Sequence, residues 1–465
     1  MNDSDIPVNN STEGLRRGMN QRQLSMMAMG GAIGVGLFLG SSVTIRLAGP
    51  GVIVTYLFAA VVALIVAYAL AEMAVMHPVA GSFGIYAERY LNPWAGFTVR
   101  ATYGVIQIIA IGAEVTAVGI YFGFWFPGVP QWAWVAGASI ILVTINTLQV
   151  RRFGEFEYYF ALIKVLAILA FIGVGIALLT GLGPTPSAGL SNLTGHGGFL
   201  PNGWKGVWLA TTLAITSYMG VEIIAVTAGE AQDPEKTIPR AMKTIVYRLI
   251  IFYVAAIAVM LAITPWNQTG GDITASPFVR AFSAAGIPYA ASIMNLVVIT
   301  AALSSSNADL YLSTRMIFSL ARGGYAPTPL GRLSDEGVPL RALAMATTGM
   351  IVAIVLAIYV PEKSFLLLYG VAVAGMFFVW LVILFSHLSF RRAIGPARAA
   401  KLPLPLPLHP IPTVVGIVAL LAIAATTLFV DGLQYSLPLF VPFLLLISLA
   451  YWKLQKNRSG LSSQG

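Results

Sequence analysis

The sequence predicts an all-α polytopic membrane protein, and three observations carry that prediction. Of the 465 residues, 57% are hydrophobic and only 10% are charged, so the chain is more apolar than a soluble domain. Apolar runs of the length that crosses a bilayer recur along the whole chain. Lys and Arg are concentrated in alternate connections between these runs. We therefore expect a multi-pass protein of the cell (cytoplasmic) membrane.

Twelve apolar runs are long enough to form transmembrane helices. They lie near 23–48, 51–75, 96–125, 130–149, 157–182, 203–229, 242–265, 288–320, 341–360, 364–389, 411–430 and 434–454. A cytoplasmic start then places both termini inside the cell. With this topology only Arg46, Lys205, Arg280 and Lys363 fall outside, and one further basic residue, Lys164, lies within a run. The other Lys and Arg residues are internal, as the positive-inside rule requires.

The runs divide into a transport core and a tail. We expect a cytoplasmic tail at 1–22, a ten-helix core at 23–390, a cytoplasmic linker at 391–410, helices 11 and 12 at 411–454, and a second cytoplasmic tail at 455–465. Alternating Leu and Pro at 402–407 predict an extended spacer within the linker. Ten helices suggest two inverted repeats of five, at about 23–182 and 203–390.

The composition excludes several functions. The absence of Cys removes disulfides, thiolate catalysis and Cys metal sites, and four scattered His residues do not suggest a metal centre. The net charge of +9 fits internal loops beside anionic lipid better than a nucleic-acid surface. Sparse intramembrane polar residues do not suggest an enzyme. We therefore expect no catalytic site, no metal, no bound cofactor and no nucleic-acid partner.

The first apolar run contains a dense group of glycines, namely Gly30, Gly31, Gly34, Gly36 and Gly40. Each Gly in a helix interior costs about 1 kcal/mol relative to Ala, so a regular helix is not expected here. Unwound backbone is tolerated at membrane depth only where it is buried in protein or lines a polar cavity. The run therefore predicts a break that forms half of a substrate site. Close helix packing through small residues is the alternative.

The sixth run occupies the matching position in the second half of the core. It carries Ser217, Tyr218, Gly220 and Glu222 near its centre. In transporters built from inverted repeats, discontinuous helices occupy corresponding positions in the two halves. We therefore predict that helices 1 and 6 are both discontinuous.

Three blocks resemble the amino acid permeases of the amino acid–polyamine–organocation superfamily. The first is the glycine-rich run at 30–38 preceded by Leu-Arg-Arg-Gly-Met at 15–19. The second runs from 217–222 into Ala-Gly-Glu-Ala-Gln-Asp-Pro-Glu-Lys-Thr-Ile-Pro-Arg-Ala at 228–241. The third joins Ser-Ser-Ser-Asn at 304–307 to Arg-Met-Ile-Phe-Ser-Leu-Ala at 315–321 and Ala-Pro at 326–327. The resemblance implies the leucine-transporter fold and amino acid uptake, usually with protons.

An amino acid presents a carboxylate and an ammonium group close together, and two helix breaks suit both. Freed N–H groups at the positive end of a half-helix bind a carboxylate. We expect them at Ala32, Ile33, Gly34, Val35 and Gly36. Freed carbonyls at Ser217, Tyr218 and Gly220 would accept hydrogen bonds from the ammonium group. Tyr103, Gln107 and Ser217 are candidates for the side-chain pocket, and Tyr218 and Trp380 for aromatic gates.

Lys164 is flanked by apolar residues on both sides. An intramembrane Lys costs about 2.5–3.5 kcal/mol to insert, so it either snorkels toward the cytoplasmic end or has a function. The functional interpretation places its ammonium group near the first break and near Ser304 and Ser305 of span 8. The resemblance implies that such a Lys substitutes for the sodium ion of sodium-coupled relatives and carries a proton.

Four intramembrane carboxylic acids complete the candidates. Glu114 and Glu222 lie mid-membrane, where they handle protons, act as gates, or serve as neutral carboxyl groups that form hydrogen bonds between helices. Glu72 and Asp309 are expected to stabilise packing or to pair with a loop Arg.

These features predict a secondary transporter that imports an amino acid, neutral or aromatic, together with protons by alternating access. An exchanger of the same fold and a non-transporting amino acid receptor are the alternatives. The sequence does not determine the oligomeric state.

Overall fold

The computed structural model describes residues 26, 31, 33–79, 82–147, 150–182, 189–226, 234–270, 276–284, 286–287, 289–334 and 337–462. Within these ranges every regular element is a helix. The longer helices are α3 (Gly40–Ala48), α4 (Val52–Met76), α5 (Ser82–Tyr90), α6 (Pro93–Phe122), α7 (Gln131–Thr147), α8 (Val150–Leu179), α9 (Gly203–Ala214), α11 (Pro234–Ile263), α13 (Pro277–Ala284), α14 (Ala290–Arg322), α16 (Thr348–Tyr359), α17 (Pro361–Ala399), α18 (Ile411–Thr426) and α19 (Ser436–Ser462). The shorter ones are α2 (Val35–Phe38), η1 (Gly49–Gly51), η2 (Ser191–Leu193), η3 (Ile215–Tyr218), α10 (Ile223–Val226), α12 (Trp266–Thr269), η5 (Thr328–Gly331), α15 (Leu340–Ala346) and η6 (Thr427–Phe429).

The all-helical, membrane-spanning character is confirmed. Eight helical stretches in the described residues are long and apolar enough to cross a membrane. They are Gly40–Met76, Pro93–Phe122, Glu157–Leu179, Ala290–Arg322, Leu340–Tyr359, Pro361–Ala399, Ile411–Phe429 and Ser436–Lys456. The count of twelve spans stays a prediction, although each of the twelve predicted runs contains at least one helix.

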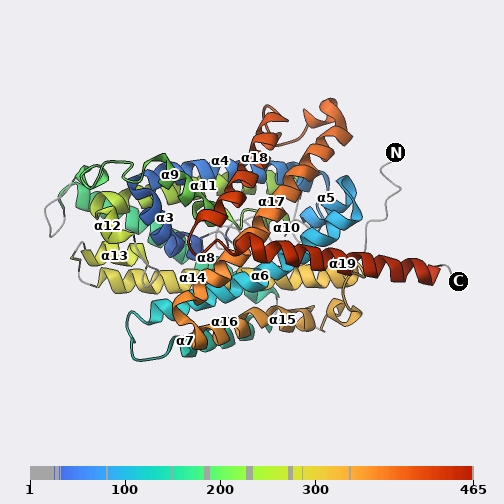
Figure 1. Ribbon diagram of the computed structural model, residues 1–465, viewed down its shortest axis with the longest axis horizontal. Coiled ribbons are helices and arrows are strands. Elements are labelled where there is room, and N and C mark those ends of the chain that lie inside the picture. Colours follow the sequence, from blue (N-terminus) through green and yellow to red (C-terminus); the bar gives the residue numbers. More distant parts are fainter. Residues whose placement is uncertain are drawn as a thin grey trace.

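Helix α6 lies at the centre of the molecule. It packs against α14, α17, α5, α16, α7 and α19. In Figure 1, α7, α15 and α16 lie along one flank, and α4, α9 and α11 lie along the other. Because α6, α14 and α17 meet in the interior, polar side chains midway along them are held far from both ends of the helices.

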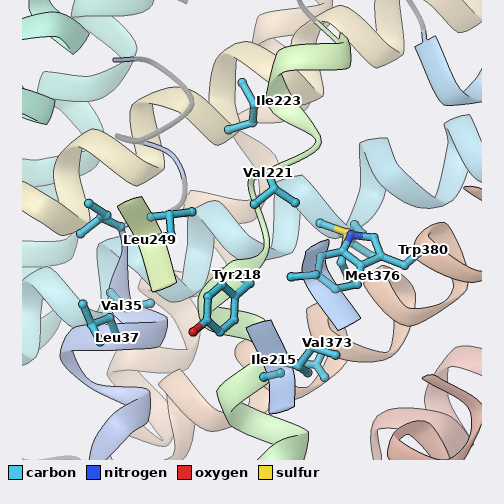
Figure 2. Close-up of a cluster of buried hydrophobic side chains, with 14 of the residues drawn as sticks. Val35, Leu37, Ile215, Tyr218, Val221, Ile223, Leu249, Val373, Met376 and Trp380 are labelled. Carbon is cyan, nitrogen blue, oxygen red and sulfur yellow. The ribbon is translucent and has the colours of Figure 1, made fainter. Parts of the chain in front are cut away.

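Both predicted helix breaks are present. In the first, Ile33 and Gly34 form a bend, Gly34 is extended (φ −123°, ψ −157°), and the short helix α2 starts at Val35. In the second, α9 and η3 end at Tyr218, Met219 is extended, and Gly220 has a φ of 105°, which L residues with side chains rarely adopt. Figure 2 shows the chain between Tyr218 and Ile223 as a coil among buried side chains.

A buried ionic cluster joins the Pro-rich linker to the core. Glu72 of α4 accepts hydrogen bonds from Arg391 Nε (2.7 Å) and Nη2 (2.8 Å), and from the backbone N–H of Leu406 (2.5 Å). His387 Nε2 lies 2.8 Å from the same carboxylate. The expectation that Glu72 pairs with an Arg is confirmed. The linker is therefore tied to α4 and α17.

Candidate functional site

A cavity lies between the two helix breaks and the midpoints of α6, α14 and α17. Its lining residues are Gly31, Gly34, Val35, Gly36, Ile106, Gln107, Ala110, Ala113, Glu114, Thr216, Met219, Gly220, Glu222, Asp309, Tyr369, Ala372, Val373 and Met376. Most of the wall is apolar, and a few polar groups converge on it from four different elements.

The first break is held by α6 and α14. The backbone N–H of Val35, the first of α2, donates to Glu114 Oε1 at 3.3 Å. Ser305 Oγ donates to the carbonyl of Ile33 at 3.4 Å. A Cβ atom at Gly34 would lie 2.5 Å from Ser305 Oγ and 2.7 Å from Glu114 Oε1, so the site needs Gly for close approach. The predicted donor end of a half-helix is therefore present, and a carboxylate already contacts it.

The second break is held by its own carboxylate. The N–H of Gly220 donates to both oxygens of Glu222 at 3.1 Å. The hydroxyl of Tyr103 donates to Glu222 Oε1 at 3.4 Å. Glu222 is fully buried, yet it also lines the cavity through part of its side chain. It therefore both stabilises the unwound segment and contributes polarity to the site.

The two breaks lie directly against each other. A Cβ atom at Gly36 would lie 3.2 Å from Ser217 Cα, which shows how closely the two backbones approach. The hydroxyls of Thr216 and Tyr369 share a short hydrogen bond beside this contact. Figure 2 shows Val35 and Leu37 of α2 near Tyr218, and Val373 and Met376 of α17 near Ile215 and Val221. One small ligand could therefore touch both breaks at once.

Lys164 is completely buried, which excludes the snorkelling interpretation. Its charge interacts with Glu157, Glu114 and Asp309. Glu157 precedes it by seven residues on α8, which is two helical turns on the same face. Glu157 in turn accepts hydrogen bonds from Ser304 Oγ (2.5 Å) and Asn307 Nδ2 (3.2 Å) of α14. Lys164 thus belongs to a buried cluster between α8, α14 and the cavity.

The predicted site residues fall into two groups. Those that line the cavity are Gly34, Val35, Gly36, Gln107, Glu114, Gly220 and Glu222. The others surround it: Ile33, Tyr103, Ser217, Tyr218, Lys164, Ser304, Ser305 and Trp380 are buried without lining it. Ala32 lies outside the described residues.

Three residues of the second group, namely Ser217, Tyr218 and Trp380, are buried in the packing around the cavity. Ser217 Oγ lies 3.3 Å from the hydroxyl of Tyr56, and the Tyr218 hydroxyl donates to the Tyr56 carbonyl at 3.0 Å. The ring of Tyr218 packs against Tyr253 with centroids 5.1 Å apart. Trp380 is fully buried in α17, one turn beyond Met376. In this structure, Tyr218 and Trp380 therefore pack in the core beside the cavity.

Sequence reasoning missed several residues of the site. Asp309 was expected to pack or to pair with a loop Arg. Instead its Oδ1 accepts a hydrogen bond from Gln107 Nε2 at 2.8 Å, and the residue lines the cavity. Glu157 could have been found from its seven-residue spacing to Lys164. Thr216 and Tyr369 gave no comparable signal, because their contact joins distant parts of the chain.

Comparison with known proteins supports one family across nearly the whole chain. The family model for amino acid permeases matches residues 23–457. An uncharacterized amino acid permease, YtnA of Bacillus subtilis, is 43% identical over 405 residues, which cover 87% of each chain. The aromatic amino acid transport protein AroP of Salmonella typhimurium is 38% identical and covers 94% of this chain and 95% of its own. The gamma-aminobutyric acid permease of Bacillus subtilis is 37% identical, and the match covers 97% of this chain and 96% of that permease. The chain therefore belongs to the amino acid permease family.

Proposed function

We propose that this permease is a secondary transporter that imports a neutral or aromatic amino acid across the cytoplasmic membrane together with protons. The observation that carries the proposal is the cavity between two touching helix breaks, with buried Lys164 beside it. Relatives named for aromatic amino acids and for gamma-aminobutyric acid support an amino acid as the substrate.

The proposed architecture is a ten-helix core of two inverted repeats with the leucine-transporter fold, followed by two further helices, and both termini cytoplasmic. The two breaks fall in the first and sixth predicted spans, where two repeats of five would place them. Alternating access would then rock one group of helices against the other around the cavity.

The substrate carboxylate would bind N–H groups at the start of α2, where the helix dipole favours negative charge. Glu114 Oε1 now accepts from the first of them, Val35 N–H. A substrate carboxylate and Glu114 would therefore compete for that donor, and Glu114 has to be neutral or turn aside when the substrate binds. The substrate ammonium group would donate to the carbonyls freed between Ser217 and Gly220.

Lys164 is proposed to couple this binding to protons. Its ammonium group is buried and interacts with the charges of Glu157, Glu114 and Asp309. Substrate binding that moves Glu114 changes the charge beside Lys164 and so changes its protonation. Lys164→Ala is expected to lose proton-driven uptake, and undiminished proton-driven uptake by this variant would contradict the assignment.

The experiment that tests the function uses the purified full chain in liposomes. A panel of labelled amino acids is offered with an imposed inward proton gradient, and in parallel with unlabelled amino acid inside and no gradient. Accumulation that follows the gradient supports proton symport. Accumulation that requires internal amino acid identifies an exchanger. Binding of amino acids without transport under either condition identifies a receptor.

The site itself is tested with Gly34→Val. Its side chain would overlap Ser305 and Glu114, so uptake should fall below detection while the protein still reaches the membrane. Gly137→Val is the matched control, because a Cβ atom at Gly137 of α7 meets open space. Normal uptake by Gly34→Val would contradict the proposed site.

A further inference from the structure

We propose that Asp309, oriented by Gln107, makes this permease selective for amino acids whose side chain ends in a hydrogen-bond donor. The inference rests on the proposed function and narrows its substrate class. It concerns a third carboxyl group in the cavity wall, beside Glu114 and Glu222.

Asp309 reaches the cavity from the middle of α14. Its neighbours Ala308 and Leu310 are buried, whereas Asp309 itself is partly exposed. Because this part of α14 is surrounded by other helices, the exposed part of Asp309 faces the cavity that it lines. Gln107 Nε2 donates to Oδ1 at 2.8 Å, which fixes the carboxyl group and leaves Oδ2 to accept from a ligand.

The position of Asp309 suits the end of a substrate side chain. Ser305, which contacts the first break, precedes Asp309 by four residues on α14. One helical turn separates them by about 6 Å along the axis. An amino acid whose carboxylate binds at the start of α2 would extend its side chain over a comparable distance, if that chain has the length of Asn or Gln.

The apolar surroundings of Asp309 require a hydrogen-bond donor on the substrate side chain. Ile106, Ala110, Val373 and Met376 contribute apolar side chains to the same cavity wall. A substrate methyl group against Asp309 would remove water from the carboxyl group and offer no hydrogen bond in return. Sites with a buried polar group discriminate strongly against an analogue that lacks the matching group. Asp309 and Gln107 therefore discriminate between substrate side chains, whereas the carboxylate and ammonium contacts are the same for all amino acids.

The test compares isosteric competitors in liposomes that contain the purified full chain. The pairs are asparagine with leucine and glutamine with methionine, each competing against one labelled substrate from the panel above. For the wild type, the donor-bearing member of each pair should reach half-inhibition at a concentration at least about tenfold lower than its apolar partner. Asp309→Leu should reduce this ratio to about one or invert it, whereas Asp309→Asn, which keeps an acceptor, should retain it.

Asp431→Leu is the matched control, since Asp431 is an exposed carboxylate on the turn after η6. If Asp309→Leu does not transport, the same pairs are compared by the thermal stabilisation that each ligand gives the purified protein. Equal inhibition by both members in the wild type, or an unchanged ratio in Asp309→Leu, would overturn the inference. Uptake of no amino acid by the wild type would instead contradict the proposed function.

Discussion

Glu72 and Glu114 are both buried carboxyl groups of this permease, yet their surroundings differ in kind. Glu72 meets two Arg nitrogens, a His nitrogen and a backbone N–H. Glu114 accepts one backbone hydrogen bond at 3.3 Å, and its Oε2 has no partner among the described residues. Glu72 is therefore fully paired within the protein, whereas Glu114 is held by a single backbone group.

The two clusters also differ in charge. At Glu72 one carboxylate faces Arg391 and His387, so negative charge is compensated on the spot. Around Lys164 a single ammonium group interacts with Glu157, Glu114 and Asp309. Carboxyl groups in excess over cations, in a site of low dielectric, have to take up protons or a cationic ligand group. The Glu72 cluster thus has the charge balance of a structural ion pair, whereas the Lys164 cluster has the unbalanced charge that the proposed proton coupling would use.

The largest expected effect on stability comes from Glu72→Gln. Breaking a buried ion pair by removing one partner leaves the other charge uncompensated and costs about 3–5 kcal/mol. Thermal unfolding of the purified protein should show this loss. Glu114→Gln should cost less than about 1 kcal/mol, since the amide oxygen can still accept from Val35 N–H, but it should impair uptake. Equal losses of stability in the two variants would remove the distinction between the clusters.

A smaller effect on stability is expected from Glu157→Gln, which separates the role of charge from the role of hydrogen bonding in the Lys164 cluster. The amide can still accept from Ser304, so stability should fall by only about 1 kcal/mol. The lost charge weakens the field at Lys164, and uptake driven by a proton gradient should fall about tenfold or more. Ser304→Ala is the control, because it removes the hydrogen bond and keeps the charge. Uptake that falls as far in Ser304→Ala as in Glu157→Gln would show that the charge is not what matters.

The sequence predicted the helix breaks because glycine acts locally. Gly34 and Gly220 weaken a helix wherever they occur in it, so their positions could be interpreted before any packing was known. Lys164 was recognised from local sequence as well, because a Lys within a long apolar run is costly to bury whatever packs around it. Glu72 lies near the end of a predicted span, where a loop Arg can reach it, so the sequence also predicted its ion pair.

The wall of the cavity could not be predicted in the same way. Asp309 and Gln107 are 202 residues apart, and their hydrogen bond depends on how α14 is rotated against α6. Apolar spans buried on most sides show little periodicity, so the sequence does not indicate which face of each helix meets the cavity. Tyr218 and Trp380 are buried beside the cavity, and their role as gates stays a prediction.

The smallest expected effect concerns pH at the edge of the Glu72 cluster. Burial, together with electrostatic interactions with His387 and Arg391, lowers the pKa of His409 to about 4 from an ordinary value near 6.5. The folded state therefore binds this proton less readily than the unfolded state. The stability that neutral His409 preserves is complete above pH 6.5 and is lost progressively as the pH falls toward 4. Because His409 is partly exposed, the loss should be about 1 kcal/mol.

His409→Gln should therefore reduce the fall in melting temperature between pH 7 and pH 5. His196→Gln, on the exposed loop before α9, should leave that fall unchanged. An identical pH dependence in wild type and His409→Gln would show that the linker contributes no titrating group to stability. A reduced dependence would instead place the acid sensitivity of the fold at the linker. Uptake measured over the same pH range would then report on the Lys164 cluster once the loss of folded protein is subtracted.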